Sequence, residues 1–170
     1  MKLQHQVTIQ APVGDLWAFI MDVPRVAGCL PGVTGVEAVD AAAGHYRGKL
    51  TAAVGPFKLS ATGVLHIEAQ DPAAHTATLR ADANAGRFGG AARASLHLSL
   101  TPAGNTTTLR IDTDAEFQGR LGGVIEPLLR KKTDAVLTAF AHKVQSRIEA
   151  DRRRDRKAQK ADPAPAEARP

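Results

Sequence analysis

Aromatic side chains and cysteines are scarce in this sequence. Only 4% of the 170 residues are aromatic, and Cys29 is the single cysteine. A lone cysteine excludes an internal disulfide, so no covalent cross-link supports the fold. The hydrophobic content of 44% is typical of a globular protein. We therefore expect a core built from aliphatic and small side chains.

Long apolar runs are also missing. No stretch approaches the roughly 18 consecutive apolar residues of a membrane span, and the N-terminal MKLQHQVTIQAP has no apolar run of the kind found in signal peptides. A chain of this length suits one hydrophobic core. We expect a cytoplasmic protein with one domain over residues 1–150, followed by a flexible tail over residues 151–170.

The positive charge is concentrated in that tail. Residues 151–170 contain seven of the 22 basic and four of the 17 acidic residues, which leaves a net charge of +2 for residues 1–150. DRRRDRKAQK can continue a preceding helix, whereas ADPAPAEARP resists packing. Such a basic run is attracted to an anionic membrane surface. No exposed aromatic platform accompanies it, so we expect no nucleic acid partner. A solvated tail is the plain alternative.

Apolar periodicity predicts a strand, two short helices, six more strands and one long helix. Residues 2–10 alternate as in a half-buried strand. Pro12 suits the first turn of a short helix, and a second short helix is expected from Asp22 until Pro31 stops it. The later strands are expected at 33–39, 44–54, 56–69, 75–84, 88–100 and 105–117. Their short connections indicate an antiparallel meander.

The long helix is expected from about residue 121 to 150, with Pro127 in or near its first turn. Its apolar residues recur at helical spacing from Leu121 to Ile148 and form one stripe. A curved sheet of seven antiparallel strands that grips this helix would bury both apolar faces. The sequence therefore predicts an α+β fold of that kind.

Almost half of the side chains expected on the inner face of the sheet are glycine or alanine. Small residues on a strongly curved sheet leave volume that one helix cannot fill, unless the helix simply sits closer to the sheet. We expect a hydrophobic cavity between the sheet and the helix. The polar side chains expected to face it are His5, Tyr46 and Thr113.

Four turns rich in glycine or proline are expected at one end of this sheet, because the turns of a meander alternate between its ends. They are residues 30–33, 54–57, 84–90 and 118–123. Turn chemistry explains their glycines but not the apolar residue that each carries. We interpret these turns as gates of a cavity mouth, and DVPRVAGCLPGV as a lid helix with its hinge. The gate residues are Pro31, Gly32, Gly55, Pro56, Gly86, Arg87 and Gly119.

Catalytic and metal-binding patterns are absent from the sequence. The six histidines lack metal-ligand spacing, and no nucleophile elbow, P-loop or dinucleotide fingerprint occurs. The candidate acids and bases Glu37, Glu68, Asp82 and Glu116 fall mostly on outward faces of the strands. We therefore expect a binding protein rather than an enzyme.

Several motifs resemble the carbon monoxide dehydrogenase G-subunit (CoxG-like) family of the START, or helix-grip (SRPBCC), superfamily. They are AP…LWAFI.D (11–22), RVAGCLPGV (25–33), Y.GKL…VGPF (46–57), ATG (61–63) and TTLRIDTDAEFQGRLG (107–122), together with the terminal helix. The resemblance covers about residues 1–150. Longer members end in a membrane anchor, whereas this chain has a basic polar tail in that place, which suggests reversible membrane contact.

The resemblance implies a hydrophobic pocket, a bound respiratory quinone (menaquinone or ubiquinone), and no covalent cofactor or metal. It also implies a partner, a molybdenum-containing carbon monoxide dehydrogenase-type complex at the inner face of the cell membrane. A polyketide cyclase or aromatase-like enzyme, or a docking module without ligand, are the alternatives.

The residues expected to line the cavity between the sheet and the helix, and so to bind the ligand, are Leu30, Tyr46, Phe57, Leu59, Ala81, Phe88, Ala92, Phe117, Leu121, Ile125 and Leu128. Tyr46 is the best candidate for a polar contact with the ligand head group. The residues expected to contact the membrane are Arg152, Arg153, Arg154, Arg156, Lys157 and Lys160.

Overall fold

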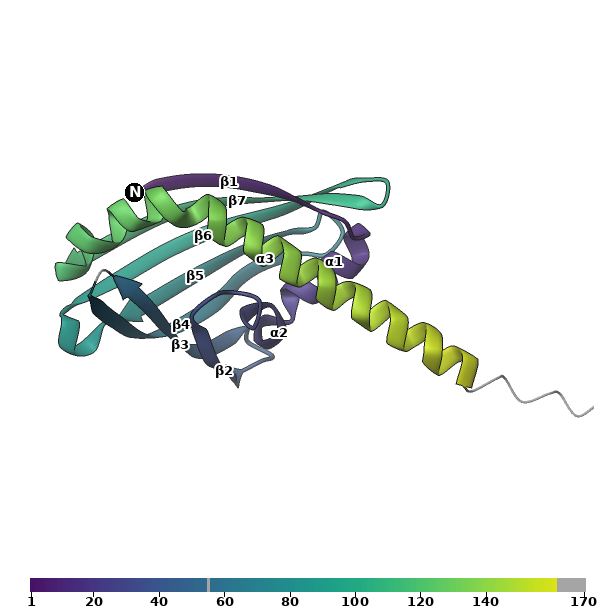
Figure 1. Cartoon of the computed structure of the whole chain (residues 1–170), viewed down its shortest axis with the longest axis horizontal. Coiled ribbons are helices and arrows are strands. Elements are labelled where there is room, and N and C mark those ends of the chain that lie inside the picture. The colour runs from purple at the N-terminus through teal and green to yellow at the C-terminus, as the bar shows by residue number, and fades with distance from the viewer. Residues whose placement is uncertain (55, 162–170) are drawn as a thin grey trace, which may run out of the picture.

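Seven antiparallel strands form one curved sheet, and a long C-terminal helix lies across its inner face (Figure 1). This computed structural model describes residues 1–54 and 56–161, with the backbone only at residues 54, 57 and 121. The strand order is β1-β7-β6-β5-β4-β3-β2. The strands are β1 Lys2–Ile9, β2 Val33–Asp40, β3 His45–Val54, β4 Phe57–Asp71, β5 Thr76–Asn84, β6 Gly90–Ala103 and β7 Thr106–Gly119. The predicted α+β meander is confirmed, and the structure adds that the first strand pairs with the last.

Two short helices follow β1, as predicted. The helix α1 spans Val13–Met21 with Pro12 at its N-cap, and α2 spans Val23–Ala27. The second helix is shorter than expected, because it ends at Ala27 rather than near Pro31. Asp22 occupies the N-cap of α2, but its side chain makes no capping hydrogen bond. A short 3₁₀ turn, η1 Gly86–Phe88, joins β5 to β6.

The turn after α2 is fixed to β3. Gly32 has a φ of +80°, and a Cβ at this position would lie 2.1 Å from the carbonyl oxygen of Thr51. The Thr51 amide donates a hydrogen bond to the Gly32 carbonyl oxygen at 2.8 Å. Only glycine tolerates this conformation and this close approach. The turn predicted as a hinge is therefore held against the sheet at this point.

The long helix α3 spans Arg120–Ala161, which extends it well beyond the expected end near residue 150. It begins directly after Gly119, whose φ is +70° and where a Cβ would lie 3.0 Å from Gly90 Cα. Pro127, expected in or near the first turn, is the eighth helical residue and lies just after the first two turns. There it cannot donate to the carbonyl of Gly123, a feature that commonly bends helices. The first turns of α3 are inclined to the rest in Figure 1.

The hydrophobic core lies where α1 and the middle of α3 cover the sheet. Its fully buried members include Ile9, Leu16, Leu109 and Val144, each no more than 2% exposed. Thr107 is also fully buried, and its hydroxyl donates to the Ala11 carbonyl at 2.8 Å. The buried apolar residues of α3 all lie between 140 and 148. Among the described side chains of its first half, none is fully buried.

Candidate functional site

The register of the central strands places small side chains next to one another on the inner face. Gly48 pairs with Gly63, Gly63 with Ala83, and Ala83 with Ala92. In the adjacent row, Leu65 pairs with Ala81. The main contacts of α3 are with β1, β7, β6 and α1, away from these strands. The half of the inner face that carries the smallest side chains is therefore not filled by the long helix.

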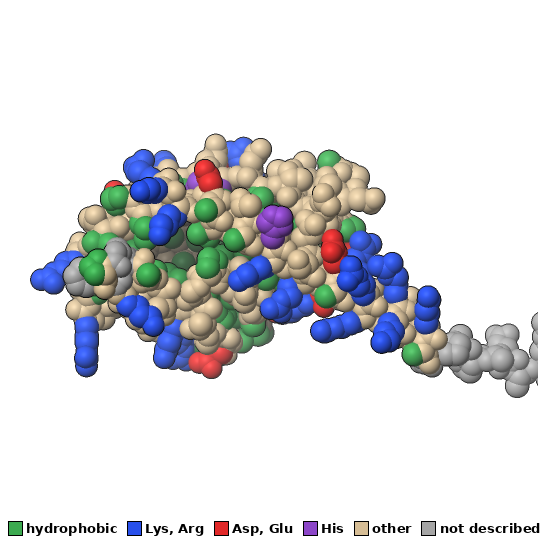
Figure 2. Space-filling model, in the orientation of Figure 1, with side chains coloured by type: hydrophobic (Ala, Val, Ile, Leu, Met, Phe, Trp, Pro, Cys, Tyr) green, Lys and Arg blue, Asp and Glu red, His purple; other side chains and the backbone are tan. Residues whose placement is uncertain are grey.

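A cavity of about 220 Å³ occupies this region between the sheet and α2. Side chains of α2 and β2 close one side of it, through Val23, Ala27 and Val36. Its other walls come from β3, β4 and β5, with Tyr46, Gly48, Leu50, Ala61, Gly63, Leu65, Ala81 and Ala83 on the inner face. Figure 2 shows a hollow below the first half of α3, bordered by hydrophobic side chains. The site is concave and almost entirely apolar.

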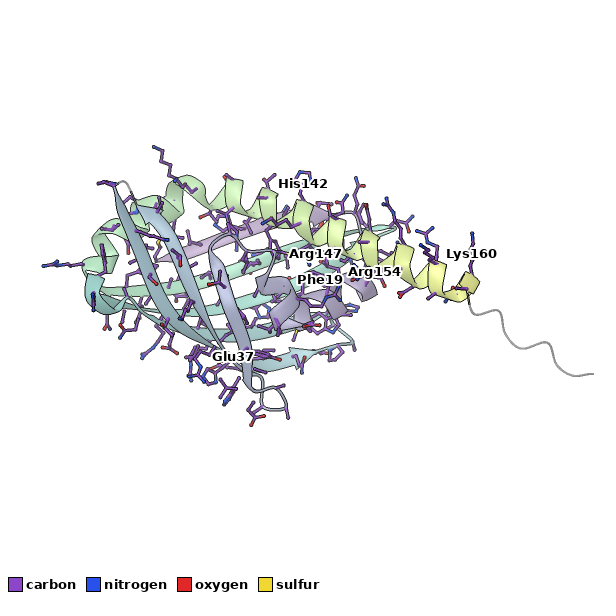
Figure 3. All side chains as sticks on the ribbon, turned by 60° about the horizontal axis from the view of Figure 1, so that its bottom comes forward. Phe19, Glu37, His142, Arg147, Arg154 and Lys160 are labelled. Carbon is purple, nitrogen blue, oxygen red and sulfur yellow. The ribbon has the colours of Figure 1, made fainter. Side chains whose placement is uncertain are left out.

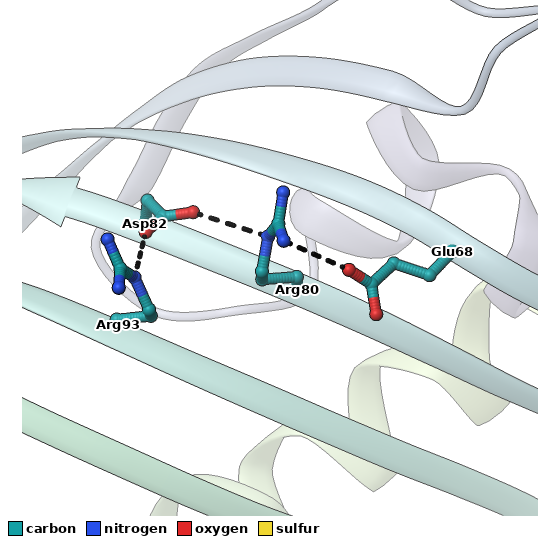
Figure 4. A network of polar contacts seen from close by, with 4 residues as sticks. All are labelled: Glu68, Arg80, Asp82 and Arg93. Carbon is teal, nitrogen blue, oxygen red and sulfur yellow. Dashed lines mark hydrogen bonds and ion pairs between the residues drawn. The ribbon is translucent and has the colours of Figure 1, made fainter.

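Charged groups beside the cavity are directed to the opposite face of the sheet. Arg47, Lys49 and Asp82 contribute to its walls, but Arg47 pairs with Glu37 at 3.8 Å and Asp82 with Arg93 at 2.9 Å, and Lys49 alternates with the inward-facing Gly48 and Leu50. The Arg93 guanidinium holds the pKa of Asp82 below its usual range. Figure 4 shows how Asp82 also approaches Arg80, which continues the network to Glu68. Tyr46 thus provides the polar side chain on the inner wall.

The predicted ligand-binding residues are divided among several places. Tyr46 and Ala81 line the cavity, whereas Leu59, Phe88 and Ile125 form a separate small cluster with Ala85. Ala92 pairs with Phe117 on the neighbouring strand, and both are half-buried. Leu128 is half-buried on α3, and Leu30 is 36% exposed after α2. The predicted contacts of the Phe57 and Leu121 side chains, and of Gly55, lie outside what the structure describes.

The predicted gate turns meet at one end of the sheet. Gly90 pairs with Gly119, which brings the β5–β6 connection beside the start of α3. The cluster of Leu59, Phe88 and Ile125 joins the same connection to β4 and α3. We call this end, which comprises residues 28–36, 49–54, 56–58, 83–92 and 117–125, the mouth end. The exposed gate residues described there are Pro31, Gly32, Pro56, Gly86, Arg87 and Gly119.

His5 and Thr113, the other polar residues expected in the cavity, do not line it. His5 faces α3, and its Nδ1 lies 3.6 Å from the Asp134 carboxylate. Its Nε2 is buried and has no hydrogen-bond partner in the part of the chain that the structure describes. Thr113 is half-buried and pairs with Leu3 and Leu96. Both residues therefore lie on the side of the sheet that α3 covers.

The residues that α2 and β2 contribute to the cavity were not predicted from the sequence. Val23, Ala27 and Val36 become part of the wall only because α2 packs over β2. Leu50, Gly63 and Leu65 were recognised as inward-facing from strand alternation but not as ligand contacts. Their alternation was a usable signal, whereas the position of α2 was not encoded in any local pattern.

The basic segment predicted to contact the membrane forms the end of α3. Arg154 and Lys160 lie where the helix extends past the sheet (Figure 3). Two residues at the base of this extension contact the domain: Arg152 pairs with Asp15 of α1 at 3.4 Å, and Asp151 pairs with Arg25 of α2. The hydrogen bond from Arg25 to Asp151 raises the pKa of Arg25. Arg152 is therefore partly engaged with the domain.

Two further properties concern metals and membranes. Within residues 1–54 and 56–161, no group of three or more His, Cys, Asp or Glu side chains is arranged to hold a metal ion. None of the described helices combines the length and the hydropathy that a bilayer crossing requires.

Comparison with known proteins identifies a family and a fold. The family model that describes the G subunit of carbon monoxide dehydrogenase (CoxG) matches residues 6–149. A conserved protein from Geobacillus kaustophilus has a similar structure, with a TM-score of 0.76, 18% identity, and coverage of 88% of this chain and 96% of that one. A START superfamily protein from Mycobacterium smegmatis gives a TM-score of 0.61 at 14% identity, covering 88% and 97% of the two chains.

An aromatase/cyclase from Streptomyces is also similar, with a TM-score of 0.58, 19% identity, and coverage of 87% and 95%. Among curated proteins, none matches this sequence. At such low identities the solved structures establish the shared fold alone.

Proposed function

The chain belongs to the CoxG family, that of the carbon monoxide dehydrogenase G subunit, and from this premise we propose that it is a non-catalytic carrier of a respiratory quinone, menaquinone or ubiquinone. It would serve a molybdenum-containing carbon monoxide dehydrogenase-type complex at the inner face of the cell membrane. The observation that carries the proposal is the apolar cavity between α2 and the small side chains of β3, β4 and β5.

The volume of the cavity suggests that it would hold the quinone ring but not the isoprenoid chain. At about 220 Å³ it lies below the roughly 300–1,000 Å³ of sites that enclose a drug-sized ligand. A quinone ring is a flat, compact group that suits this volume, with a carbonyl accepting a hydrogen bond from the Tyr46 hydroxyl. The isoprenoid chain would lie below the first half of α3, where Ile125, Leu128 and Leu129 remain half-buried.

The basic end of α3 supports a role near the membrane. Arg153, Arg154, Arg156, Lys157 and Lys160 are exposed on a helix that extends past the sheet. Each such charge near an anionic bilayer contributes about 1 kcal/mol to binding. Because salt screens exposed charges beyond about 8 Å, this contact would be peripheral and salt-sensitive. Reversible contact suits a carrier that exchanges its ligand with the bilayer.

Extraction of the purified protein with organic solvent, followed by mass spectrometry, tests the carrier directly. We expect a quinone to be recovered chemically unchanged. Ala83→Leu fills the inner face at the cavity, so it should reduce quinone uptake from detergent-solubilised stock at least about tenfold. Ala91→Leu, on the outer face of the neighbouring β6, is the matched control and should bind normally. Absence of quinone binding by the unmodified chain would refute the carrier and favour a docking module.

A cyclase-like enzyme is the second candidate, and His5 is the observation that favours it. Its Nδ1 lies 3.6 Å from the exposed Asp134 carboxylate and its Nε2 has no hydrogen-bond partner among the described residues, which leaves that nitrogen free to accept a proton. His5 is nevertheless remote from the cavity lining, and its Nε2 is covered. We expect His5→Gln to retain quinone binding. Chemical conversion of a bound ligand that is lost in His5→Gln would establish the enzyme instead.

A further inference from the structure

Cationic residues gather in the turns at one end of the sheet. The mouth end contains Lys49, Lys58, Arg87 and Arg120, and the acidic residues Glu37, Asp82, Glu116 and Glu126 lie just outside its bounds. The turns at the other end, residues 39–45, 69–76 and 101–107, contain Asp40 and Asp71 but no lysine or arginine. The turns at the two ends of the sheet therefore differ in charge, although residues 1–150 carry only a small net charge. Figure 2 shows several Lys and Arg side chains around the left-hand end, where α3 begins.

The cations of the mouth end differ in their surroundings from the arginines on the strands and on α2. Elsewhere, ion pairs with carboxylates engage Arg25, Arg47, Arg80, Arg93 and Arg110. Lys49, Lys58, Arg87 and Arg120 are all exposed, and across the described residues none of them forms an ion pair. Their charge is therefore not neutralised within the domain, and it is available to an external anionic surface.

Apolar side chains lie among these cations. Leu30 is 36% exposed and Leu50 is 42% exposed, although Leu50 belongs to the inner face and lines the cavity. The two are close in the fold, because Val33 pairs with Leu50 directly after the turn that contains Leu30. Exposed leucines surrounded by cations are typical of protein surfaces that enter the interface of an anionic bilayer. A purely acidic protein face would leave these leucines without an apolar partner.

The basic end of α3 cannot provide this contact. Arg152 lies 32 residues after Arg120 in the same helix, which corresponds to roughly 48 Å at 1.5 Å per residue. Charges separated by much more than the Debye length of about 8 Å act independently in physiological salt. A protein held at a bilayer only by the end of α3 would leave the mouth end free to point away from the lipid. Entry of a ligand from the bilayer then needs a second contact near the cavity.

We propose that the mouth end is itself a docking site for an anionic phospholipid bilayer. Lys49, Lys58, Arg87 and Arg120 contact the lipid phosphates, and Leu30 and Leu50 enter the interface. The docked orientation directs the cavity opening beside Leu50 toward the lipid. The proposed carrier function supplies the reason for such an orientation, but docking is a separate property and is measured without quinone.

A fluorescent probe at position 30 tests the orientation. In a Cys29→Ala background of the full chain, Leu30→Cys and Ala73→Cys are each labelled with an environment-sensitive dye. Ala73 is exposed in a turn at the opposite end of the sheet, so it serves as the matched control. On vesicles of phosphatidylglycerol and phosphatidylcholine, the emission at position 30 should shift to the blue while that at position 73 stays constant. Vesicles of phosphatidylcholine alone should shift neither.

Charge removal tests the cations. To isolate the mouth end, the full chain carries glutamine at positions 153, 154, 156, 157 and 160, which leaves the ion pairs of Asp151 and Arg152 intact. In this background Arg87→Gln with Arg120→Gln should weaken vesicle binding roughly 25-fold, at about 1 kcal/mol per charge. Lys143→Gln with Arg147→Gln removes the same charge from a distant part of α3 and should change binding less than about twofold (Figure 3).

The outcomes separate docking from quinone binding. Two results would overturn the docking proposal: vesicle binding without a blue shift at position 30, or equal losses of binding from the two glutamine pairs. An acidic protein would then be the better candidate for binding the cationic mouth end. Quinone recovery from the purified protein would then still stand. Conversely, a blue shift at position 30 in a protein that never binds quinone would retain the docking site and refute the carrier.

Discussion

The two halves of the inner sheet face are both built from antiparallel strand pairs, but their packing differs. On β1, β6 and β7, the large side chains Ile9, Leu98, Leu100 and Leu109 are buried under α1 and the middle of α3. On β3, β4 and β5, Gly48, Gly63 and Ala83 leave a cavity beside α2. We call these regions the packed half and the hollow half. Stability is concentrated in the first, and the volume for a ligand in the second.

The strand β5 crosses both regions and shows that small side chains alone do not make a cavity. Ala77 near its start is 2% exposed and belongs to the main core, whereas Ala81 and Ala83 on the same face line the cavity. The three side chains are identical, so the difference arises from what lies opposite. Helix α1 and residues 140–148 of α3 cover the first position, and no helix fills the space above the others.

The largest expected effect contrasts one leucine from each half. Leu109→Ala in the packed half should lower the free energy of unfolding by about 3 kcal/mol, because a fully buried leucine leaves a rigid void. Leu65→Ala in the hollow half should cost about 1 kcal/mol, since Leu65 already borders empty volume. Urea denaturation of the ligand-free protein measures both. Equal losses would mean that the hollow half is packed as tightly as the rest in solution.

The next prediction enlarges side chains instead of truncating them, and it compares two alanines of β5. Ala77→Leu should destabilise the fold by about 2 kcal/mol, because its surroundings have no room for the larger side chain. Ala83→Leu should change stability by less than about 1 kcal/mol, since the added carbons enter the cavity. Thermal and urea unfolding of the ligand-free variants would show the difference. Similar destabilisation at both positions would indicate that the cavity closes when no ligand is bound.

Strand alternation and turn chemistry predicted most of the fold. They indicated the seven strands, the two short helices and the long helix, because each depends on local periodicity or on glycine and proline at turns. The end of α3 was placed too early, since the stripe of apolar residues stops at Ile148 while the polar helix continues to Ala161. Pro127 was expected in or near the first turn, and it is the eighth residue because α3 begins at Arg120, one residue before the expected start.

The sequence predicted the site less completely than it predicted the fold. Alternation correctly put Tyr46 and Ala81 on the inner face, and small side chains suggested a cavity. The same reasoning included Leu59, which proved to be buried in a separate cluster with Ala85. Which part of the sheet is left uncovered depends on where α1, α2 and α3 cross it, and these crossings follow from tertiary packing. A sequence pattern for a single element does not contain that information.

The smallest expected effect concerns the outer face of the hollow half. There Asp82 of β5 pairs with Arg93 of β6, and the pKa of Asp82 lies below its usual range because Arg93 donates a hydrogen bond to its carboxylate. A carboxylate with a lowered pKa stabilises the folded state at every pH above the unfolded pKa of about 3.9. This contribution disappears as the pH falls through the folded pKa.

Both groups are solvent-exposed, so the effect is small and screened by salt. We therefore expect Asp82→Asn to be slightly less stable than the unmodified protein at neutral pH and low salt, with the difference lost once the pH falls below the lowered pKa of Asp82 in the folded state. Asp114→Asn on the outer face of β7 is the control, because no ion pair of Asp114 occurs among the described residues. A stability difference for Asp82→Asn that persists unchanged into acid would show that the pair with Arg93 does not hold β5 and β6 together beside the cavity.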